Sequence, residues 1–152
     1  MKHSIIKTLA TLMAACLPAV ASAQNFMSGG IGYHVLSAEE HTVEVTGKES
    51  CTPYSGNINI PATVTYNGTT YDVVALGEQA FSKASLSGIT IPSSVTRIKR
   101  GCFLFATSPS SITIPASVEV IEPMAFVSAL LYYGFIIHYN WYNVKKTCVC
   151  IL

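Results

Sequence analysis

Hydrophobic residues recur at fixed intervals through the middle of the chain. The segment Ile89–Val95 (ITIPSSV) returns as Ile112–Val118 (ITIPASV), a shift of 23 (112 minus 89). In both units the valine is followed by an isoleucine three positions later and by a phenylalanine five positions after that, at Phe103 and Phe126. Self-similarity at a period of roughly 20–50 residues is typical of stacked repeats. The pattern therefore predicts a repeat architecture.

An earlier copy of the unit is interrupted. It begins at Ile58–Pro61 (INIP) and resumes at Val73, and Phe81 then falls on schedule. The inserted segment, 65–73, contains Asn67-Gly68 between β-branched and aromatic residues. Asn-Gly in this setting is a strong signal for a two-residue hairpin turn, because both residues tolerate positive φ. We expect a two-stranded hairpin inserted into the first unit.

Each unit is expected to contain two strands and a short helical turn. The Ile-x-Ile alternation places two isoleucines inward and one polar residue outward, and the following proline ends the strand. The segment Glu78–Phe81 and its equivalents suggest the helical turn, with the phenylalanine closing the core. One unit cannot bury these positions alone, so the core must form between neighbouring units.

The N-terminal segment 1–23 has the composition of a secretory signal peptide. Lys2 and Lys7 precede the apolar stretch Leu9–Val20, and Ala21-Ser22-Ala23 supplies small residues for cleavage. Cleavage after Ala23 leaves a mature chain that begins at Gln24. The apolar stretch is too short to span a bilayer. Lipid attachment at Cys16 is the alternative to a secreted product.

Charge excludes several partners. Without the signal, seven Lys and Arg residues stand against eight Asp and Glu residues. This balance provides no basic surface for nucleic acid or for anionic lipid, and we expect neither partner nor a transmembrane span in the mature chain. The mature chain keeps four cysteines, in a compartment that permits disulfides, and their three pairings stay open: Cys51, Cys102, Cys148 and Cys150. Cys102 stands where other units have alanine, which predicts a small buried thiol.

No arrangement of residues indicates catalysis, a cofactor or a metal. The mature chain has three histidines, and no nucleophile elbow, ligand pair or phosphate loop accompanies them. His34 and His41 could face each other across a hairpin as metal ligands, whereas exposed edge histidines are the simpler interpretation. We therefore expect a chain that is not an enzyme.

Two groups of residues are candidates for binding. The outward strand positions Asn59, Thr90 and Thr113, with the neighbouring serines Ser87, Ser110 and Ser111, are expected to form a polar ladder on one face. Arg97, Lys99 and Arg100 form a local basic cluster suited to an acidic partner or a glycan. An ordinary solvated face is the alternative for both groups.

The pattern Ile-x-Ile-Pro-x-Ser-Val-x-x-Ile followed by Ala-Phe resembles the BspA-like leucine-rich repeats of bacterial secreted and surface proteins. Residues 31–37, 42–46 and 64–71 resemble them too. The resemblance implies a right-handed leucine-rich repeat solenoid, strand-rich with short helical turns and about three repeats of the period found above. It also implies export, and binding of a protein partner, for some members host adhesion. The glycine that commonly follows the repeat isoleucine is present as Gly77 but replaced by Lys99 and Glu122.

The C-terminal end departs from the pattern. After Ala129 only Phe135-Ile136-Ile137 falls where a strand is due. We expect an N-terminal β cap region at 24–57, repeats at 58–137 and a divergent or disordered tail at 138–152. The end is a divergent cap, a truncated or altered reading frame, or a membrane-contacting segment. A structural element that associates with itself or another chain through residues 130–142 is thus the alternative to a binding module.

Overall fold

The computed structural model describes residues 24–48, 52–107, 111–127, 136–138 and 146–147. Several positions of the sequence predictions lie outside this part of the chain: residues 1–23, which are predicted as a signal peptide and include Cys16, and Cys51, Ser110, Cys148, Cys150 and most of residues 130–142. The described residues form twelve strands: β1 (Asn25–Ser28), β2 (Ile31–Ser37), β3 (Thr42–Thr46), β4 (Ser55–Asn59), β5 (Thr63–Tyr66), β6 (Thr69–Leu76), β7 (Ser85–Thr90), β8 (Arg97–Ile98), β9 (Ser111–Thr113), β10 (Val120–Ile121), β11 (Ile136–His138) and β12 (Lys146–Thr147).

The N-terminal strands start the larger sheet. Strands β1, β2 and β3 pair antiparallel in sequence order, and β3 then pairs in parallel with β6. Gly29 and Gly30 turn the chain between β1 and β2 with φ of 56° and 79°, a backbone region open to glycine. The antiparallel strands thus present an edge on which parallel pairing begins.

The inserted hairpin forms around Asn67-Gly68. Strands β5 and β6 pair antiparallel, with Tyr66 opposite Thr69, so the loop has two residues. Asn67 and Gly68 both have positive φ, of 49° and 81°. This is the backbone that the two-residue hairpin requires, and it matches the twist of the strands. Strand β6 then continues into the parallel part of the sheet.

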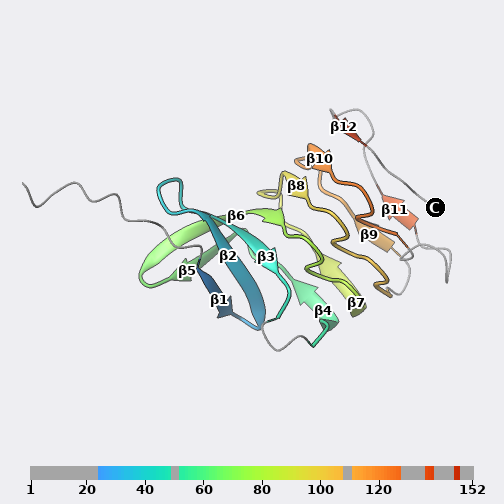
Figure 1. The fold of residues 1–152 in the computed structure, drawn as a ribbon, viewed down its shortest axis with the longest axis horizontal. Helices are drawn as coiled ribbons and strands as arrows, with labels where there is room; N and C mark the ends of the chain where they lie inside the picture. Colours follow the sequence, from blue (N-terminus) through green and yellow to red (C-terminus); the bar gives the residue numbers. More distant parts are fainter. Residues whose placement is uncertain (1–23, 49–51, 108–110, 128–135, 139–145, 148–152) are drawn as a thin grey trace, which may run out of the picture.

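Successive repeat units add parallel strands in two rows (Figure 1). The large sheet continues from β6 through β8 and β10 to β12, and smaller sheets pair β4 with β7 and β9 with β11. Arg97 pairs with Val120, a shift of 23 (120 minus 97), whereas Val120 pairs with Lys146, a shift of 26 (146 minus 120). Parallel pairing therefore continues past residue 137, further along the chain than the sequence pattern indicates.

The side chains of the Ile-x-Ile strands alternate between the core and the surface, as the sequence pattern predicts. Thr90 is exposed, while Ile91 is buried and Ile89 packs partly buried against the core. Thr113 is likewise exposed between the buried Ile112 and Ile114.

A column of aromatic rings runs through the core across the units, with Phe81, Phe103 and Phe126 stacked and Tyr54 tilted against Phe81. The centroid distances are 5.0 Å from Tyr54 to Phe81, 5.3 Å from Phe81 to Phe103 and 5.1 Å from Phe103 to Phe126. Phe81 and Phe103 are fully buried. Each ring is covered by rings from the neighbouring units rather than by its own unit, so the aromatic column ties the units together.

The segments expected as short helical turns are not helices, and no helix occurs in the described residues. Their amides bond to the next unit: Phe81 N donates to Cys102 O at 2.8 Å, and Phe103 N to Ala125 O at 2.7 Å. An α-helix would instead direct each amide to the carbonyl four residues back. Gln79, Gly101 and Met124, at equivalent positions, have φ of 53°, 60° and 64°, which ends any helical run.

Tyr54 joins the N-terminal strands to the first unit. Its hydroxyl donates to Thr46 O and accepts from Gly32 N, both at 2.8 Å. The ring is buried against Phe81, and burial raises the pKa of the phenol. The N-terminal strands therefore provide an acceptor and a donor for the buried hydroxyl, which avoids the cost of an unpaired polar group.

Phe103 and Phe105 allow a matched test of the aromatic column. Phe103 is fully buried, whereas Phe105 is 52% exposed two residues later. We expect Phe103→Ala to lower the free energy of unfolding by about 3–5 kcal/mol because it leaves a cavity between two rings. Phe105→Ala should change it by no more than about 0.5 kcal/mol. Urea denaturation of both variants measures the difference, and equal effects would contradict the stacking account.

Candidate binding surface

Three of the predicted polar residues lie on neighbouring strands at equivalent positions. Asn59 on β4 pairs directly with Thr90 on β7, and Thr113 lies on β9, the strand beside β7 in Figure 1. All three side chains are exposed. Paired strands lie about 4.8 Å apart, so Asn59 and Thr90 are direct neighbours, and Thr113 continues the row at the equivalent position of the next unit. We call Asn59, Thr90 and Thr113 the polar row.

Of the three predicted serines, Ser87 is the one whose side chain the structure describes. Ser87 is exposed on β7, beside the polar row. Ser111 begins β9, where its backbone pairs with Ile136, and Ser110 lies outside the described residues. The pairing of Thr113 with His138 also brings β11 into line with the row.

Sequence reasoning missed Asn57 as a member of this surface. Asn57 pairs with Gly88, and a β-carbon added at Gly88 would lie 2.6 Å from Asn57 Oδ1. The amide of Asn57 therefore lies across the bare backbone of the next strand. The feature of the sequence that could have indicated this contact is Gly88, because a glycine within a strand marks a place where another group approaches the backbone closely. Asn57 adds an exposed amide beside the row.

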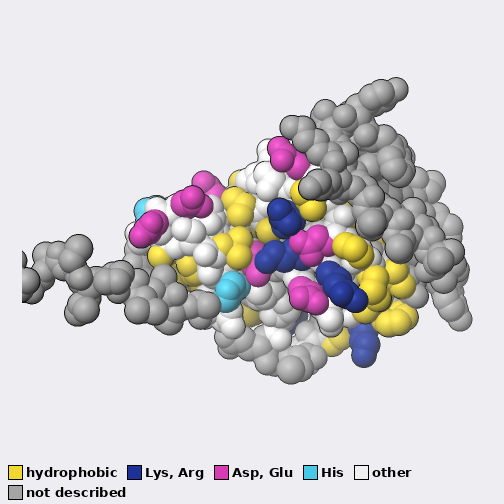
Figure 2. Space-filling model, turned by 45° about the horizontal axis from the view of Figure 1, so that its top comes forward, with side chains coloured by type: hydrophobic (Ala, Val, Ile, Leu, Met, Phe, Trp, Pro, Cys, Tyr) yellow, Lys and Arg dark blue, Asp and Glu magenta, His cyan; other side chains and the backbone are white. Residues whose placement is uncertain are grey.

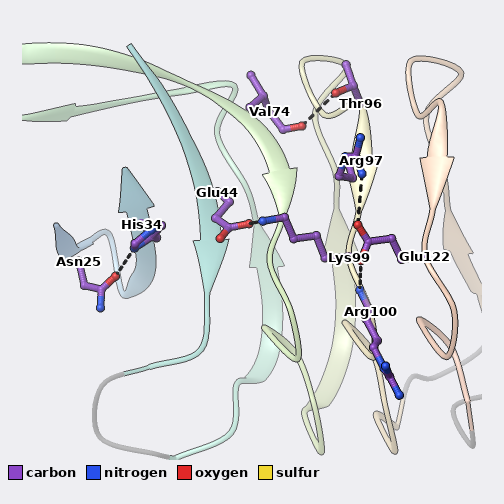
Figure 3. A network of polar contacts seen from close by, with 9 residues as sticks. All are labelled: Asn25, His34, Glu44, Val74, Thr96, Arg97, Lys99, Arg100 and Glu122. Carbon is purple, nitrogen blue, oxygen red and sulfur yellow. Dashed lines mark hydrogen bonds and ion pairs between the residues drawn. The ribbon is translucent and has the colours of Figure 1, made fainter. Parts of the chain in front are cut away.

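The basic residues do not form a uniformly positive surface. Glu122 accepts from both arginines, with 3.2 Å from Arg97 Nη1 to Oε1 and 3.0 Å from Arg100 N to Oε2 (Figure 3). Lys99 Nζ lies 2.7 Å from Glu44 Oε2. Two of the three positive charges are thus paired with acids from other units, which local sequence could not reveal. Of these three cations, only the guanidinium of Arg100 lacks an ion pair among the described residues.

The contact between Glu44 and Lys99 passes over Gly77. Gly77, Lys99 and Glu122 follow the paired residues Leu76, Ile98 and Ile121, so they occupy one position in three successive units. A β-carbon at Gly77 would lie 2.5 Å from Val45 O and 3.3 Å from the Glu44 carboxylate. Glu44 is buried, and the Lys99 ammonium is the polar partner that its Oε2 has among the described residues. Because Gly77 has no side chain, Glu44 of the N-terminal strands can contact Lys99 of the second unit.

The histidines do not face each other as metal ligands. His34 Nδ1 lies 2.7 Å from Asn25 Oδ1, and the His41 ring packs edge-on against Tyr71 with 5.7 Å between centroids. His34 pairs with Glu44 across the strands, while His41 lies in the turn before β3, because the register places them apart. The alternative metal interpretation is therefore wrong for this pair.

Cys102 is a free, fully buried thiol, as its alignment with Ala80 and Ala125 predicts. Burial raises the pKa of the thiol, so it stays protonated and unreactive at neutral pH. The structure does not describe Cys51, Cys148 and Cys150, and their pairing stays open.

Residues 56–149 match the BspA type leucine rich repeat region in six copies. The chain belongs to this family. The match covers the parallel units from β4 to β12, including the strands that follow residue 129. No curated protein matches the chain. In the described residues no helix is long and apolar enough to cross a membrane.

Solved structures of bacterial repeat proteins share this family's fold. A leucine rich cell surface protein from Faecalibacterium prausnitzii is 26% identical, with a TM-score of 0.58 over 76% of this chain and 30% of its own. A leucine-rich repeat protein from Bacteroides capillosus is also 26% identical, with a TM-score of 0.53 over 76% of this chain and 99% of its own. The pneumococcal vaccine antigen PcpA, 19% identical with a TM-score of 0.51, shares the fold. This chain spans less than a third of the first of these proteins.

A substitution at Gly77 tests whether the contact between Glu44 and Lys99 requires a residue without a side chain at this position. We expect Gly77→Ala to destabilise the fold by about 1–3 kcal/mol, because the new methyl meets the Val45 carbonyl and displaces the Glu44 carboxylate from Lys99. Gly47→Ala is the control, since its methyl would come no closer than 3.9 Å to any neighbour. Thermal unfolding of both variants measures the effect. Equal melting temperatures would contradict the claim that Gly77 leaves room for the Glu44 carboxylate.

Proposed function

We propose that this chain is a secreted or cell-surface module that binds a protein partner through the polar row, without a cofactor and without catalysis. Membership of a repeat family with a cell-surface protein among its structural neighbours supports a binding role. The observation that carries the proposal is the exposure of Asn59 and Thr90, which pair in register, and of Thr113 at the equivalent position of the next unit. Repeat proteins commonly recognise partners on such extended faces.

The chemistry of the surface suits a protein partner. Hydroxyl and amide side chains offer both donors and acceptors, and the Asn57 amide extends this set beside the row. Arg97 and Lys99 are held in ion pairs, so recognition by charge alone is weaker than recognition by hydrogen bonds at the row. We further propose host-protein adhesion as the role of this binding.

A pair of double variants tests the polar row. We expect Thr90→Arg with Thr113→Arg to weaken binding of the mature protein to an immobilised panel of host extracellular proteins at least tenfold, about 1.4 kcal/mol. Long charged side chains would cover the row without touching the core. Thr65→Arg with Ser93→Arg is the control, because both hydroxyl residues are exposed elsewhere.

Surface plasmon resonance measures the affinities, and urea denaturation verifies that the variants remain folded. Equal affinity of the row variant and the control for every bound protein would exclude the polar row as the binding surface.

Export is part of the proposal, with residues 1–23 as the removed signal. In that case the protein recovered outside the membrane of an expressing bacterium begins at Gln24. Intact mass spectrometry checks the N-terminus. A lipid-modified N-terminal Cys16 would instead establish the anchored alternative, and an unprocessed Met1 in the cytoplasm would contradict export.

The second candidate function is that of an assembly element which associates through its apolar C-terminal end, or a shortened relative of a longer repeat protein. Strand β12 is the last in its sheet and β11 the last in its own, so parallel edges are available there in the described part. The longer chain of the Faecalibacterium neighbour fits the second form of this candidate. A monomer at micromolar concentration in light scattering would exclude assembly through this end.

A further inference from the structure

Apolar side chains gather on the outer edge of the turns between units. Phe105 is 52% exposed, and Leu104, Met124 and Val127 are partly exposed. The backbone causes this, because Phe105 has φ of 58° and its amide donates to Val127 O at 3.1 Å. Phe103 therefore points inward and Phe105 outward. Figure 2 shows hydrophobic side chains gathered beside basic ones on this side of the molecule.

Two cations flank these residues. Lys83 occupies the turn position equivalent to Phe105 in the preceding unit, and its amide donates to Leu104 O at 2.8 Å. Arg100 Nη2 lies 3.5 Å from Met124 Sδ. Neither side chain has an ion pair among the described residues, and the remainder of the sequence contains one acidic residue, Glu49. We call this surface the turn edge: Lys83, Arg100, Leu104, Phe105, Met124 and Val127.

The opposite charge lies on the tip of the N-terminal hairpin. Glu39 and Glu40 form the turn between β2 and β3, and Asp72 pairs with Thr42 beside it. All three acids are exposed and have no ion pair among the described residues. Leu36, 43% exposed, precedes them on β2. At the left of Figure 2, where this hairpin lies, the acidic side chains have no basic neighbours.

The two surfaces are complementary in both charge and polarity. Each combines one exposed apolar side chain, Leu36 or Phe105, with charged side chains that have no ion pair among the described residues. These are acidic at the hairpin tip and mostly basic at the turn edge, where Glu78 lies in the turn before Lys83. Two copies of the turn edge would repel each other, whereas the turn edge and the hairpin tip attract. A single chain carries both surfaces on different elements, so contact between two copies leaves one free surface of each kind.

We propose that the hairpin tip of one copy docks on the turn edge of the next. The carboxylates of Glu39 and Glu40 approach Lys83 and Arg100, and Leu36 packs on Phe105. This contact is heterologous, so it extends into chains of copies rather than closing as a two-fold dimer. Exposed ion pairs are individually weak and screened by salt, so the assembly is weak and salt-sensitive. The inference does not depend on partner binding by the polar row.

Charge reversal tests this contact on the mature protein, residues 24–152. We expect sedimentation velocity to show reversible association at low salt, reduced at least tenfold at 0.5 M salt, roughly a 4 Å screening length. Glu39→Lys with Glu40→Lys should remain monomeric, and so should Lys83→Glu with Arg100→Glu. An equimolar mixture of the two variants should associate, since the basic tip of one then meets the acidic edge of the other.

The control reverses an exposed acid that lies on neither surface, Glu119→Lys, and should associate as the original chain does. Urea denaturation establishes that each variant is folded. A monomeric original chain, variants that associate undiminished, or a mixture that stays monomeric would each overturn the contact. Association that persists at high salt in both variants would assign assembly to the apolar C-terminal end instead.

Discussion

The structure depends on contacts between repeat units, because no unit can bury its own phenylalanine. Phe103 lies between Phe81 and Phe126, and its amide bonds to the following unit. Serine hydroxyls reinforce the joint, with Ser94 donating to Val73 O at 2.7 Å and Ser117 to Val95 O at 2.8 Å. Removal of one unit therefore removes partners from both neighbours, which is the nearest-neighbour character of repeat proteins.

This frame determines what the outer surface can offer. Stacking of the units brings equivalent residues of successive units to the same face, so one polar residue per strand becomes part of the polar row. The same rule aligns Gly77, Lys99 and Glu122, where it produces ion pairs instead of a binding surface. Two of the units depart from the family's glycine at this position. These departures tie the N-terminal strands and the third unit to the second.

Much of the fold follows from spacing in the sequence. The shift of 23 between the units that contain Arg97 and Val120, the inward isoleucines and the Asn67-Gly68 hairpin all rest on local patterns, and the structure confirms each. The expected helical turns were wrong, because the amides of Phe81 and Phe103 find acceptors in the next unit. The pairing of the basic cluster and the placement of Asn57 over Gly88 were not predictable, since they join residues that lie far apart in the sequence. Binding at the polar row stays a prediction.

Amide hydrogen exchange of residues 24–152 tests the central claim that the units are held by one another. The decisive amides are those of Phe81, Thr96 and Phe103, which donate across units at 2.7–2.9 Å. If the units depend on one another, these amides exchange slowly and together, with protection that falls in parallel as urea is added. Exchange at loop rates, or protection lost in one unit while the others keep theirs, would contradict the account.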